Sequence, residues 1–167
     1  MIEALAAGAD NARRACYARA MEWPVTYARK IRFSDSDAQG IVFNGNYPIY
    51  IDDATTDFFD VIGIPWEAFT RTGYEMVLGR SEIDYRSAGR MGETLVTGAR
   101  VARFGNTSVV FELQTWEETS QRVVIDARLV YVVVDHETFR PKPVPAFFIE
   151  AVEKAQGGAV ERGSAKS

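Results

Sequence analysis

Cysteine and histidine are nearly absent from this chain of 167 residues, which has one of each, Cys16 and His136. A single cysteine excludes an intramolecular disulfide, and one cysteine with one histidine is too few for a metal cage. A Ser-His-Asp hydrolase needs a histidine beside its nucleophile, but His136 lies in a polar stretch typical of a surface turn, and no G-x-S-x-G motif is present. We therefore expect no metal, no cofactor and no histidine-dependent hydrolase site.

Long apolar runs and an excess of positive charge are also missing. No apolar run approaches the ~18 residues that a membrane span needs, and polar residues interrupt the alanines near the N-terminus, so no signal peptide is expected. The net charge of −4 provides no basic field for nucleic acid or an anionic membrane. We expect a cytoplasmic protein that binds neither, and any anionic ligand would need a local arginine cluster.

The length and the ordinary globular composition fit one domain. Residues 1–22 are rich in Ala and Arg but poor in large apolar residues, and we interpret them as an N-terminal extension. Residues 156–167 are interpreted as a C-terminal tail. Residues 23–155 form the predicted domain, in which we find no internal repeat.

The clearest local pattern is helical. Apolar residues spaced by four and three positions lie on one face of a predicted helix: Tyr47, Ile51, Ala54, Phe58 and Val61. Asn46 is the predicted N-cap, Pro48 is tolerated in the first turn, and Gly63 followed by Pro65 ends the helix. We therefore predict one long amphipathic helix in the first half of the domain.

Most of the remaining sequence is typical of β-strands. The predicted strands cover residues 25–33, 75–86, 94–104, 108–116 and 123–134, with a bulge near Gly79. Short helical segments are predicted at residues 66–72 and 147–153. One strand, one long helix and four successive strands joined by short turns predict an α+β fold, in which a single antiparallel sheet wraps around the helix.

The most concentrated chemistry lies between the first strand and the long helix, where residues 33–47 read FSDSDAQGIVFNGNY. A helix N-terminus presents unpaired backbone N–H groups and partial positive charge, which can stabilise a developing oxyanion. A carboxylate just upstream, across a glycine-containing turn, can face the same point, and Asp37 is the candidate. This pair is the minimum for acyl transfer from a thioester. Asp35 is better explained as a residue that closes the loop by hydrogen bonds.

Two other interpretations of this loop are weaker. Residues 35–40 resemble the opening of an EF-hand, but Asn46 occupies the twelfth position, where glutamate is needed, and no helix precedes the loop. An aspartate-dependent phosphatase would need a lysine and further acidic residues on a parallel sheet, whereas the later strands predict an antiparallel one.

The run DSDAQGIVFNGNY at residues 35–47, followed by IDDATTDFF at residues 51–59, resembles the hotdog-fold 4-hydroxybenzoyl-CoA thioesterase family. The runs IDYRSAGRMGETL at residues 83–95 and FGNTS at residues 104–108 are similar to later segments of that family. The resemblance covers roughly residues 25–134. Its first motif is characteristic of acyl-CoA thioesterases, and the later runs mark the fold more than the reaction.

The resemblance implies a role for each matched residue. Asp37 matches the catalytic aspartate, which acts as nucleophile or as base for water. Asn44 and Gly45 match the helix-start positions where a backbone N–H meets the thioester carbonyl, and Tyr47 matches the aromatic residue that packs there. Asp52 matches the aspartate that meets the phenolic hydroxyl in 4-hydroxybenzoyl-specific members, although a solvated carboxylate explains it equally well.

The chain also departs from those members, which carry consecutive basic residues at the turn between the third and fourth strands. Here residues 105–107 read GNT, and the nearest cations are Arg100 and Arg103, with Arg90 as a further candidate for the CoA phosphates. The nucleotide is therefore held differently or more weakly, or the acyl carrier is not CoA.

The resemblance implies a thioester hydrolase acting on an aromatic acyl-CoA, such as 4-hydroxybenzoyl-CoA, or on a fatty acyl-CoA. One alternative is a thioesterase for acyl groups on a carrier protein, and another is a non-catalytic module that binds acyl-CoA. Members of the family place the site at a subunit interface, so a homodimer or homotetramer is expected.

Overall fold

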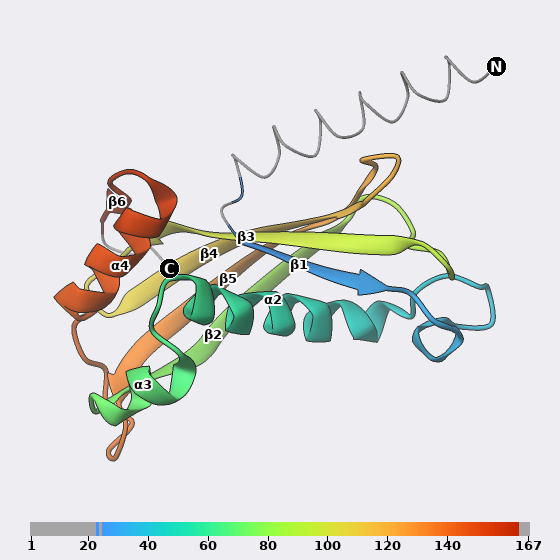
Figure 1. Cartoon of the computed structure of the whole chain (residues 1–167). Coiled ribbons are helices and arrows are strands. Elements are labelled where there is room, and N and C mark those ends of the chain that lie inside the picture. Colours follow the sequence, from blue (N-terminus) through green and yellow to red (C-terminus); the bar gives the residue numbers. More distant parts are fainter. Residues whose placement is uncertain (1–22, 24, 164–167) are drawn as a thin grey trace.

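The computed structural model of the chain describes residue 23 and residues 25–163. The predicted N-terminal extension and the last residues of the predicted tail lie outside the described residues. An antiparallel sheet with the strand order β1-β3-β4-β5-β2 curls around the helix α2 (Figure 1). The predicted fold class, α+β with one sheet around one helix, is confirmed.

Apart from two 3-10 turns, the elements from β1 to α4 follow one another in the order that the sequence predicts. After β1 (Val25–Lys30) come two 3-10 turns, η1 (Phe33–Asp35) and η2 (Asn44–Asn46), and then α2 (Tyr47–Val61) and α3 (Trp66–Arg71). The remaining elements are β2 (Tyr74–Tyr85), β3 (Thr94–Phe104), β4 (Ser108–Glu117), β5 (Val123–Asp135), α4 (Ala146–Gln156) and β6 (Glu161–Arg162).

Helix α2 begins and ends where the sequence predicts, but its N-terminus lacks the expected side-chain cap. Gly63, with φ of 76°, adopts the left-handed conformation that commonly ends a helix. Asn46 was predicted to cap the N-terminus, but its side chain makes no capping bond; its amide donates instead to the Asp35 carbonyl oxygen at 2.9 Å. The tertiary contact thus replaces the local one. None of the helices in the described ranges is long and apolar enough to cross a membrane.

Strand β2 is an edge of the sheet and carries the predicted bulge. Its register against β5 shifts between Leu78 and Arg80, which places the irregularity at Gly79. Three large side chains of this strand stay exposed, since Val77 is 40% exposed, Leu78 49% and Tyr85 53%. An unpaired edge with exposed apolar side chains is a surface on which another chain can pair.

The C-terminal part contributes more structure than the sequence predicts. Helix α4 is longer than the predicted segment and buries Phe148 and Val152. Within the predicted tail, β6 pairs in parallel with the end of β3, and Val160 is buried beside it. These elements close the end of the sheet that lies away from the start of α2 (Figure 1).

Candidate active site

The residues between β1 and α2 form a loop that folds back on itself. A β-bridge joins Ser36 to Val42, and the Asp37 N–H donates to the Ile41 carbonyl oxygen at 2.9 Å. The Gly40 N–H returns to the Asp37 carbonyl oxygen at 3.0 Å, and Gly40 has a left-handed φ of 74°, which favours glycine. Asp37 therefore lies near the tip of a tight, hairpin-like turn.

The Asp37 side chain is half-buried, and one of its oxygens is engaged within the turn. Its Oδ1 accepts the Gln39 N–H at 2.8 Å, the bond of an Asx-turn. The described residues supply no second hydrogen bond to this carboxylate. The bond to Gln39 orients the group and leaves it able to act on a substrate or a water molecule.

The start of the helical segment after this turn is open to solvent. Asn44 and Gly45, the first residues of η2, are both exposed, and the first amides of a helical segment have no intrahelical acceptor. A β-carbon on Gly45 would lie 2.6 Å from the Phe43 ring, so the missing side chain lets that ring lie across the turn. These two residues offer N–H donors at the positive end of α2.

Tyr47 packs the start of α2 and ties it to the turn before β3. It is 3% exposed, and its hydroxyl accepts the Gly89 N–H at 3.1 Å. The Gly89 carbonyl oxygen in turn accepts the Val42 N–H at 2.9 Å. Burial raises the pKa of the Tyr47 hydroxyl, opposed by the bond from Gly89. Tyr47 thus holds the helix, the loop and the turn together.

The three candidate arginines lie in different places. Arg90 is exposed and forms a β-bridge with Ile41, so it is next to the loop that carries Asp37. β3 begins opposite the end of β1, and at about 3.3 Å per residue Arg100 and Arg103 lie about 20 and 30 Å along it. Arg100 also pairs with Glu112 at 3.0 Å and stacks on Trp23. Within one chain, only Arg90 of these three is brought to Asp37.

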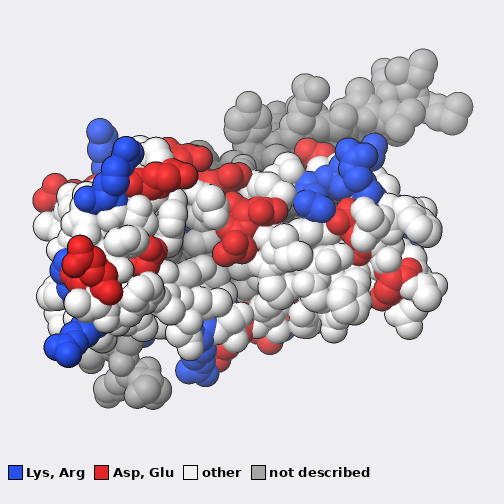
Figure 2. Space-filling model, turned by 90° about the horizontal axis from the view of Figure 1, so that it is seen from below, with Lys and Arg blue, Asp and Glu red and all other residues white. Residues whose placement is uncertain are grey.

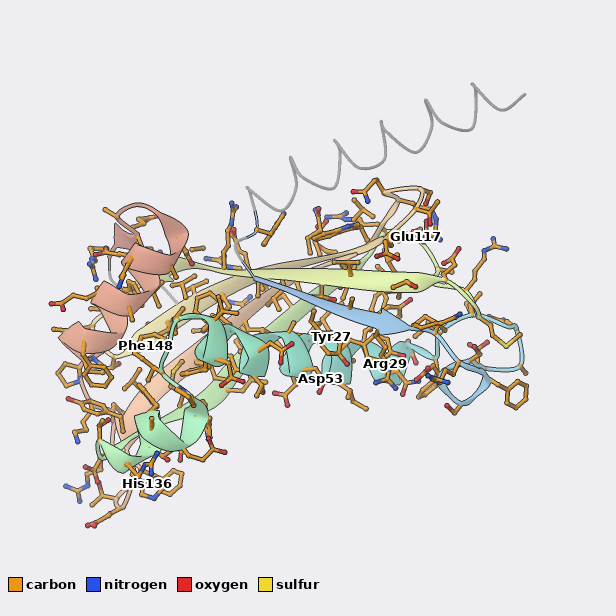
Figure 3. The ribbon with its side chains drawn as sticks, in the orientation of Figure 1. Tyr27, Arg29, Asp53, Glu117, His136 and Phe148 are labelled. Carbon is orange, nitrogen blue, oxygen red and sulfur yellow. The ribbon has the colours of Figure 1, made fainter. Side chains whose placement is uncertain are left out.

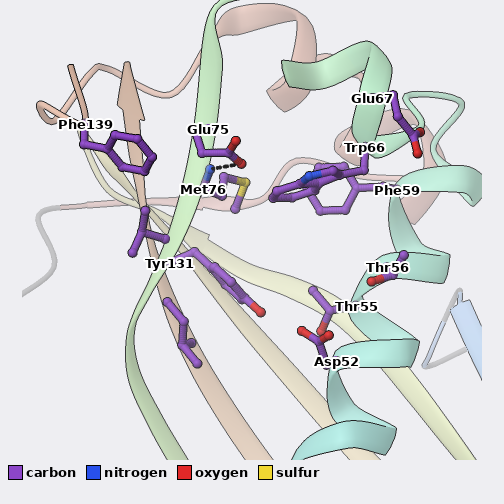
Figure 4. A pocket seen from close by; sticks show the side chains of 12 residues that line it. Asp52, Thr55, Thr56, Phe59, Trp66, Glu67, Glu75, Met76, Tyr131 and Phe139 are labelled. Carbon is purple, nitrogen blue, oxygen red and sulfur yellow. Dashed lines mark hydrogen bonds between the residues drawn. The ribbon is translucent and has the colours of Figure 1, made fainter. Parts of the chain in front are cut away.

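A groove runs along the side of α2 that faces β2 and β5 (Figure 4). Its main cavity has a volume of about 660 Å³ and is lined by Asp52, Thr55, Thr56, Phe59, Trp66, Glu67, Glu75, Met76, Val77, Leu78, Tyr131 and Phe139. A smaller cavity of about 50 Å³ shares Asp52, Leu78 and Tyr131 with it and extends to Pro48, in the first turn of α2. The groove therefore continues from the start of the helix to α3.

A polar cluster lies part of the way along this groove. Figure 4 shows the Asp52 carboxylate, the Thr55 side chain and the Tyr131 hydroxyl gathered on one side of the cavity. Burial, and after it the Asp52 charge, raises the pKa of Tyr131. Asp52 itself is exposed, so it is a groove residue that remains accessible to a ligand.

The groove also has an acidic rim, to which Glu67 and Glu75 contribute together with Asp52. The Glu75 carboxylate lies 3.1 Å from His136 Nδ1 and accepts the Met76 N–H at 3.2 Å. Figure 2, which looks onto the side of the molecule that carries α2, shows acidic side chains over the middle, with both basic and further acidic side chains toward the ends. Negative charge thus dominates around the entrance.

Sequence reasoning found Asp52 but missed the residues that the strands contribute to the groove. Tyr131 and Glu75 come from strands far away in the chain, and only the pairing of β2 with β5 brings them to α2. The alternation along β5, in which Leu129, Tyr131 and Val133 are buried, was the signal that could have placed Tyr131 on the helix side.

The sequence and the fold match known proteins. The sequence pattern of the Thioesterase-like superfamily matches residues 31–152. The Acyl-CoA thioester hydrolase YbgC of Escherichia coli O157:H7 is 22% identical over 123 residues, which cover 74% of this chain and 88% of that protein. The chloroplastic Acyl-acyl carrier protein thioesterase ATL3 of Arabidopsis thaliana is 24% identical over 117 residues, 70% of this chain and 61% of that one.

Solved thioesterase structures share the fold. A thioesterase from Thermus thermophilus, complexed with coenzyme A and Zn, has a TM-score of 0.69 at 24% identity, covering 81% of this chain and 96% of that one. Slr0204, a 1,4-dihydroxy-2-naphthoyl-CoA thioesterase from Synechocystis, has a TM-score of 0.70 at 16% identity, covering 77% and 94%. The architecture is therefore that of the hotdog-fold thioesterases.

The chain belongs to the Thioesterase-like superfamily, whose pattern spans well over half of it. The predicted resemblance to this class is confirmed. The chain spans about three fifths of the length of ATL3 and about half of a candidate esterase from Aquifex aeolicus, to which 63 residues are 35% identical.

Proposed function

We propose that this protein hydrolyses acyl-CoA thioesters, with Asp37 as the catalytic carboxylate. The observation that carries the proposal is the loop geometry: a half-buried, singly bonded Asp37 precedes a solvent-open helix start, and a groove begins at the first turn of the same helix. Membership of the Thioesterase-like superfamily supports it. A carboxylate, N–H donors and an acyl groove are the parts that thioester hydrolysis needs.

In the proposed reaction, the amides at Asn44 and Gly45 stabilise the carbonyl oxygen as the carbon becomes tetrahedral. Asp37 either attacks that carbon, forming an anhydride that water then opens, or takes a proton from the attacking water. The carbon–sulfur bond breaks in both routes. Both release a carboxylic acid and free CoA thiol, so a thiol assay follows either one.

The groove supports a proposal for the size and polarity of the acyl group. A helix rises about 1.5 Å per residue, so Asp52 lies about 9 Å and Phe59 about 20 Å along the axis from Asn46. The space beyond Asp52 is lined mainly by aromatic and apolar side chains, including Trp66 and Met76. We propose an acyl group longer than a single benzoyl ring, either aliphatic or polycyclic aromatic.

The polar cluster adds a further preference. Asp52 is a hydrogen-bond acceptor at a depth that a hydroxyl on the acyl group would reach, which supports the role that the family resemblance gives it. A second carboxylate on the acyl group would meet Asp52, Glu67 and Glu75 and be repelled. We therefore expect hydroxylated acyl groups to be accepted better than dicarboxylic ones.

A carrier-protein substrate is the second candidate. The observation that favours it is the separation of Arg100 and Arg103 from Asp37, which leaves Arg90 as the only one of the three candidate cations beside the loop. ATL3, a relative, is an acyl-acyl carrier protein thioesterase by name. A non-catalytic acyl-CoA-binding module is less well supported, since binding alone does not require Asp37.

We also propose that two copies of the chain pair to complete the site. Val77 and Leu78 line the groove and are exposed on the edge strand β2, so a partner pairing there would cover the groove. Leu78→Lys should shift the dimer to monomer in light scattering while the fold, measured by circular dichroism, is kept. A wild type that is monomeric at micromolar concentration would overturn this proposal.

The test of the proposed function is thiol release from matched acyl substrates. The panel contains short, long, hydroxylated and dicarboxylic acyl-CoAs and the same acyl groups on a carrier protein. We expect turnover of long and hydroxylated acyl-CoAs, and Asp52→Asn should raise KM for the hydroxylated substrate severalfold while leaving the unsubstituted one within twofold. Turnover of carrier-bound substrates alone would favour the second candidate, and binding without thiol release would favour the non-catalytic module.

A further inference from the structure

Asp35, which stands two residues before Asp37, is the most strongly tied residue of the loop. Its side chain is 6% exposed; Oδ1 accepts Arg29 Nη2 at 2.8 Å and Oδ2 accepts the Arg32 N–H at 2.8 Å. Its carbonyl oxygen accepts the Phe43 N–H at 2.9 Å and the Asn46 side-chain amide at 2.9 Å. One residue therefore joins the strand, both arms of the loop and the start of the helical segment.

Among the groups that bond to Asp35, the Arg29 guanidinium is the charged one that comes from the sheet. It lies on β1, 36% exposed, and its guanidinium also stacks on the Tyr50 ring of α2, 4.8 Å from the ring centre. Burial, together with the neighbouring Asp35 carboxylate, raises the pKa of Tyr50 to about 12, so its hydroxyl stays neutral beside Asp35. Arg29 thus contacts the loop and the helix at the same time.

We propose that Arg29 and Asp35 are a positioning pair that holds Asp37 in register with the amides at the start of α2. This inference rests on the proposed function, because Asp37 and those amides are its proposed catalytic parts. Removing Arg29 would leave a buried carboxylate without its counter-charge, and the loop would have to open to solvate it. A displacement of about 1 Å in a reacting group can cost about a hundredfold in rate.

The chain offers a matched control on the same face of the same strand. Tyr27 lies two residues before Arg29, and its hydroxyl donates to Asp53 Oδ2 on α2 at 2.8 Å (Figure 3). Both bonds link β1 to a carboxylate, but Asp53 lies within the helix rather than in the loop. Tyr27→Phe therefore removes a comparable strand-to-carboxylate bond, together with the contact of the Tyr27 hydroxyl with Arg29, and leaves the Arg29–Asp35 ion pair in place.

The experiment compares steady-state kinetics of Arg29→Met, Arg29→Lys and Tyr27→Phe on the best substrate of the wild type. Arg29→Met should lower kcat about tenfold or more with KM within threefold, because the acyl groove is untouched. Arg29→Lys keeps one charged donor and should recover kcat to within about threefold. Tyr27→Phe should stay within twofold of wild type. A kcat of Arg29→Met within twofold of wild type, or an equal loss in Tyr27→Phe, would overturn the inference.

A second measurement does not depend on turnover. Hydrogen exchange at the Phe43 amide, which donates to Asp35, should accelerate at least tenfold in Arg29→Met and remain unchanged in Tyr27→Phe. If the wild type cleaves no thioester, the proposed function fails and exchange alone decides whether the pair orders the loop. Should Arg29→Met not fold, Asp35→Asn replaces it, since its amide can still accept the Arg32 N–H while the ion pair is lost. An unchanged exchange rate at the Phe43 amide in Arg29→Met, or in Asp35→Asn where that variant replaces it, contradicts the positioning role.

Discussion

The two ends of α2 are built from different interactions. At its end, aromatic rings pack edge to face or tilted: Phe59 lies 5.0 Å from Trp66, 5.7 Å from Phe69 and 5.5 Å from Phe148 between ring centres. At its start, the loop of residues 33–46 is held by hydrogen bonds and one half-buried ion pair, and its rings at Phe33 and Phe43 are 85% and 53% exposed.

Because of this difference, the end of α2 contributes mainly to the stability of the fold, and its start carries the groups proposed to react. Each buried aromatic side chain contributes about 1.5–3 kcal/mol by leaving water, so the end of α2 anchors the fold. Each hydrogen bond at the start contributes only about 0.5–1.5 kcal/mol net, but it fixes direction. The start can therefore keep polar groups and open amides available for a reaction, because the far end supplies the free energy that holds the helix on the sheet.

The largest effect on stability is expected at the aromatic end. Phe148→Ala removes a fully buried ring from α4 and should lower the free energy of unfolding by about 3–5 kcal/mol. Urea unfolding measures this loss, and kcat per folded molecule should stay within threefold of wild type. Loss of kcat in the folded variant would mean that the two ends are coupled.

A smaller effect is expected from Tyr47→Phe, at the start of α2. The change leaves the buried Gly89 N–H without its acceptor and should cost about 1–3 kcal/mol in the free energy of unfolding. Because Gly89 also holds the loop through Val42, we expect kcat to fall more than KM rises. An unfolding free energy equal to that of wild type would show that a water molecule takes the place of the hydroxyl.

The polar loop before α2 should also make the free energy of unfolding depend on pH in the acid range. Although burial opposes it, the bonds from the Arg32 N–H and Arg29 lower the pKa of Asp35 below its ordinary value. Its contribution to stability is complete above the unfolded pKa of about 3.9 and is lost as pH falls through the lower folded value. Unfolding curves from pH 6 to pH 2.5 should show this loss in wild type, and Asp35→Asn should flatten it. Equal pH dependence in both would contradict the assignment.

The smallest effect lies on the exposed side of α2. Burial, followed by the charges of Asp60 and Asp53, raises the pKa of Asp57, so its charged form destabilises the helix at neutral pH and the penalty disappears as pH falls through the raised value. Asp57→Asn should therefore stabilise the protein by about 0.2–0.5 kcal/mol at pH 7. The gain should be absent at pH 3, and a gain that persists there would point to another cause.

The fold could be predicted because its patterns are local. The four-three spacing of apolar residues along α2, the glycine that follows it and the bulge at Gly79 all depend on neighbours in the sequence. The loop with Asp37 was found for the same reason, as a polar segment between a strand and a helix. The pairing of β6 with β3 was not predicted, because a two-residue strand shows no periodicity in the sequence.

The rest of the site depends on contacts between distant segments. The Asn46 amide turns to Asp35 rather than capping its own helix, a choice that only the folded loop makes available. Arg29 gave no signal in the sequence, because an arginine in a half-exposed strand is ordinarily solvated. Likewise, the groove exists only where β2 and β5 pass beside α2, so the alternation along β5 could place Tyr131 on the helix side of the sheet but could not assign Tyr131 or Glu75 to a groove.

The central claim is that the carboxylate of Asp37 performs the reaction at the start of α2. Its most direct test is thiol release from the best acyl substrate by Asp37→Asn, with Asp60→Asn as the control at an exposed aspartate near the end of the helix. The account predicts a loss of kcat of about a hundredfold or more for Asp37→Asn, unchanged urea unfolding to within about 1 kcal/mol, and wild-type kinetics for Asp60→Asn. A folded Asp37→Asn that keeps a kcat within threefold of wild type would contradict it.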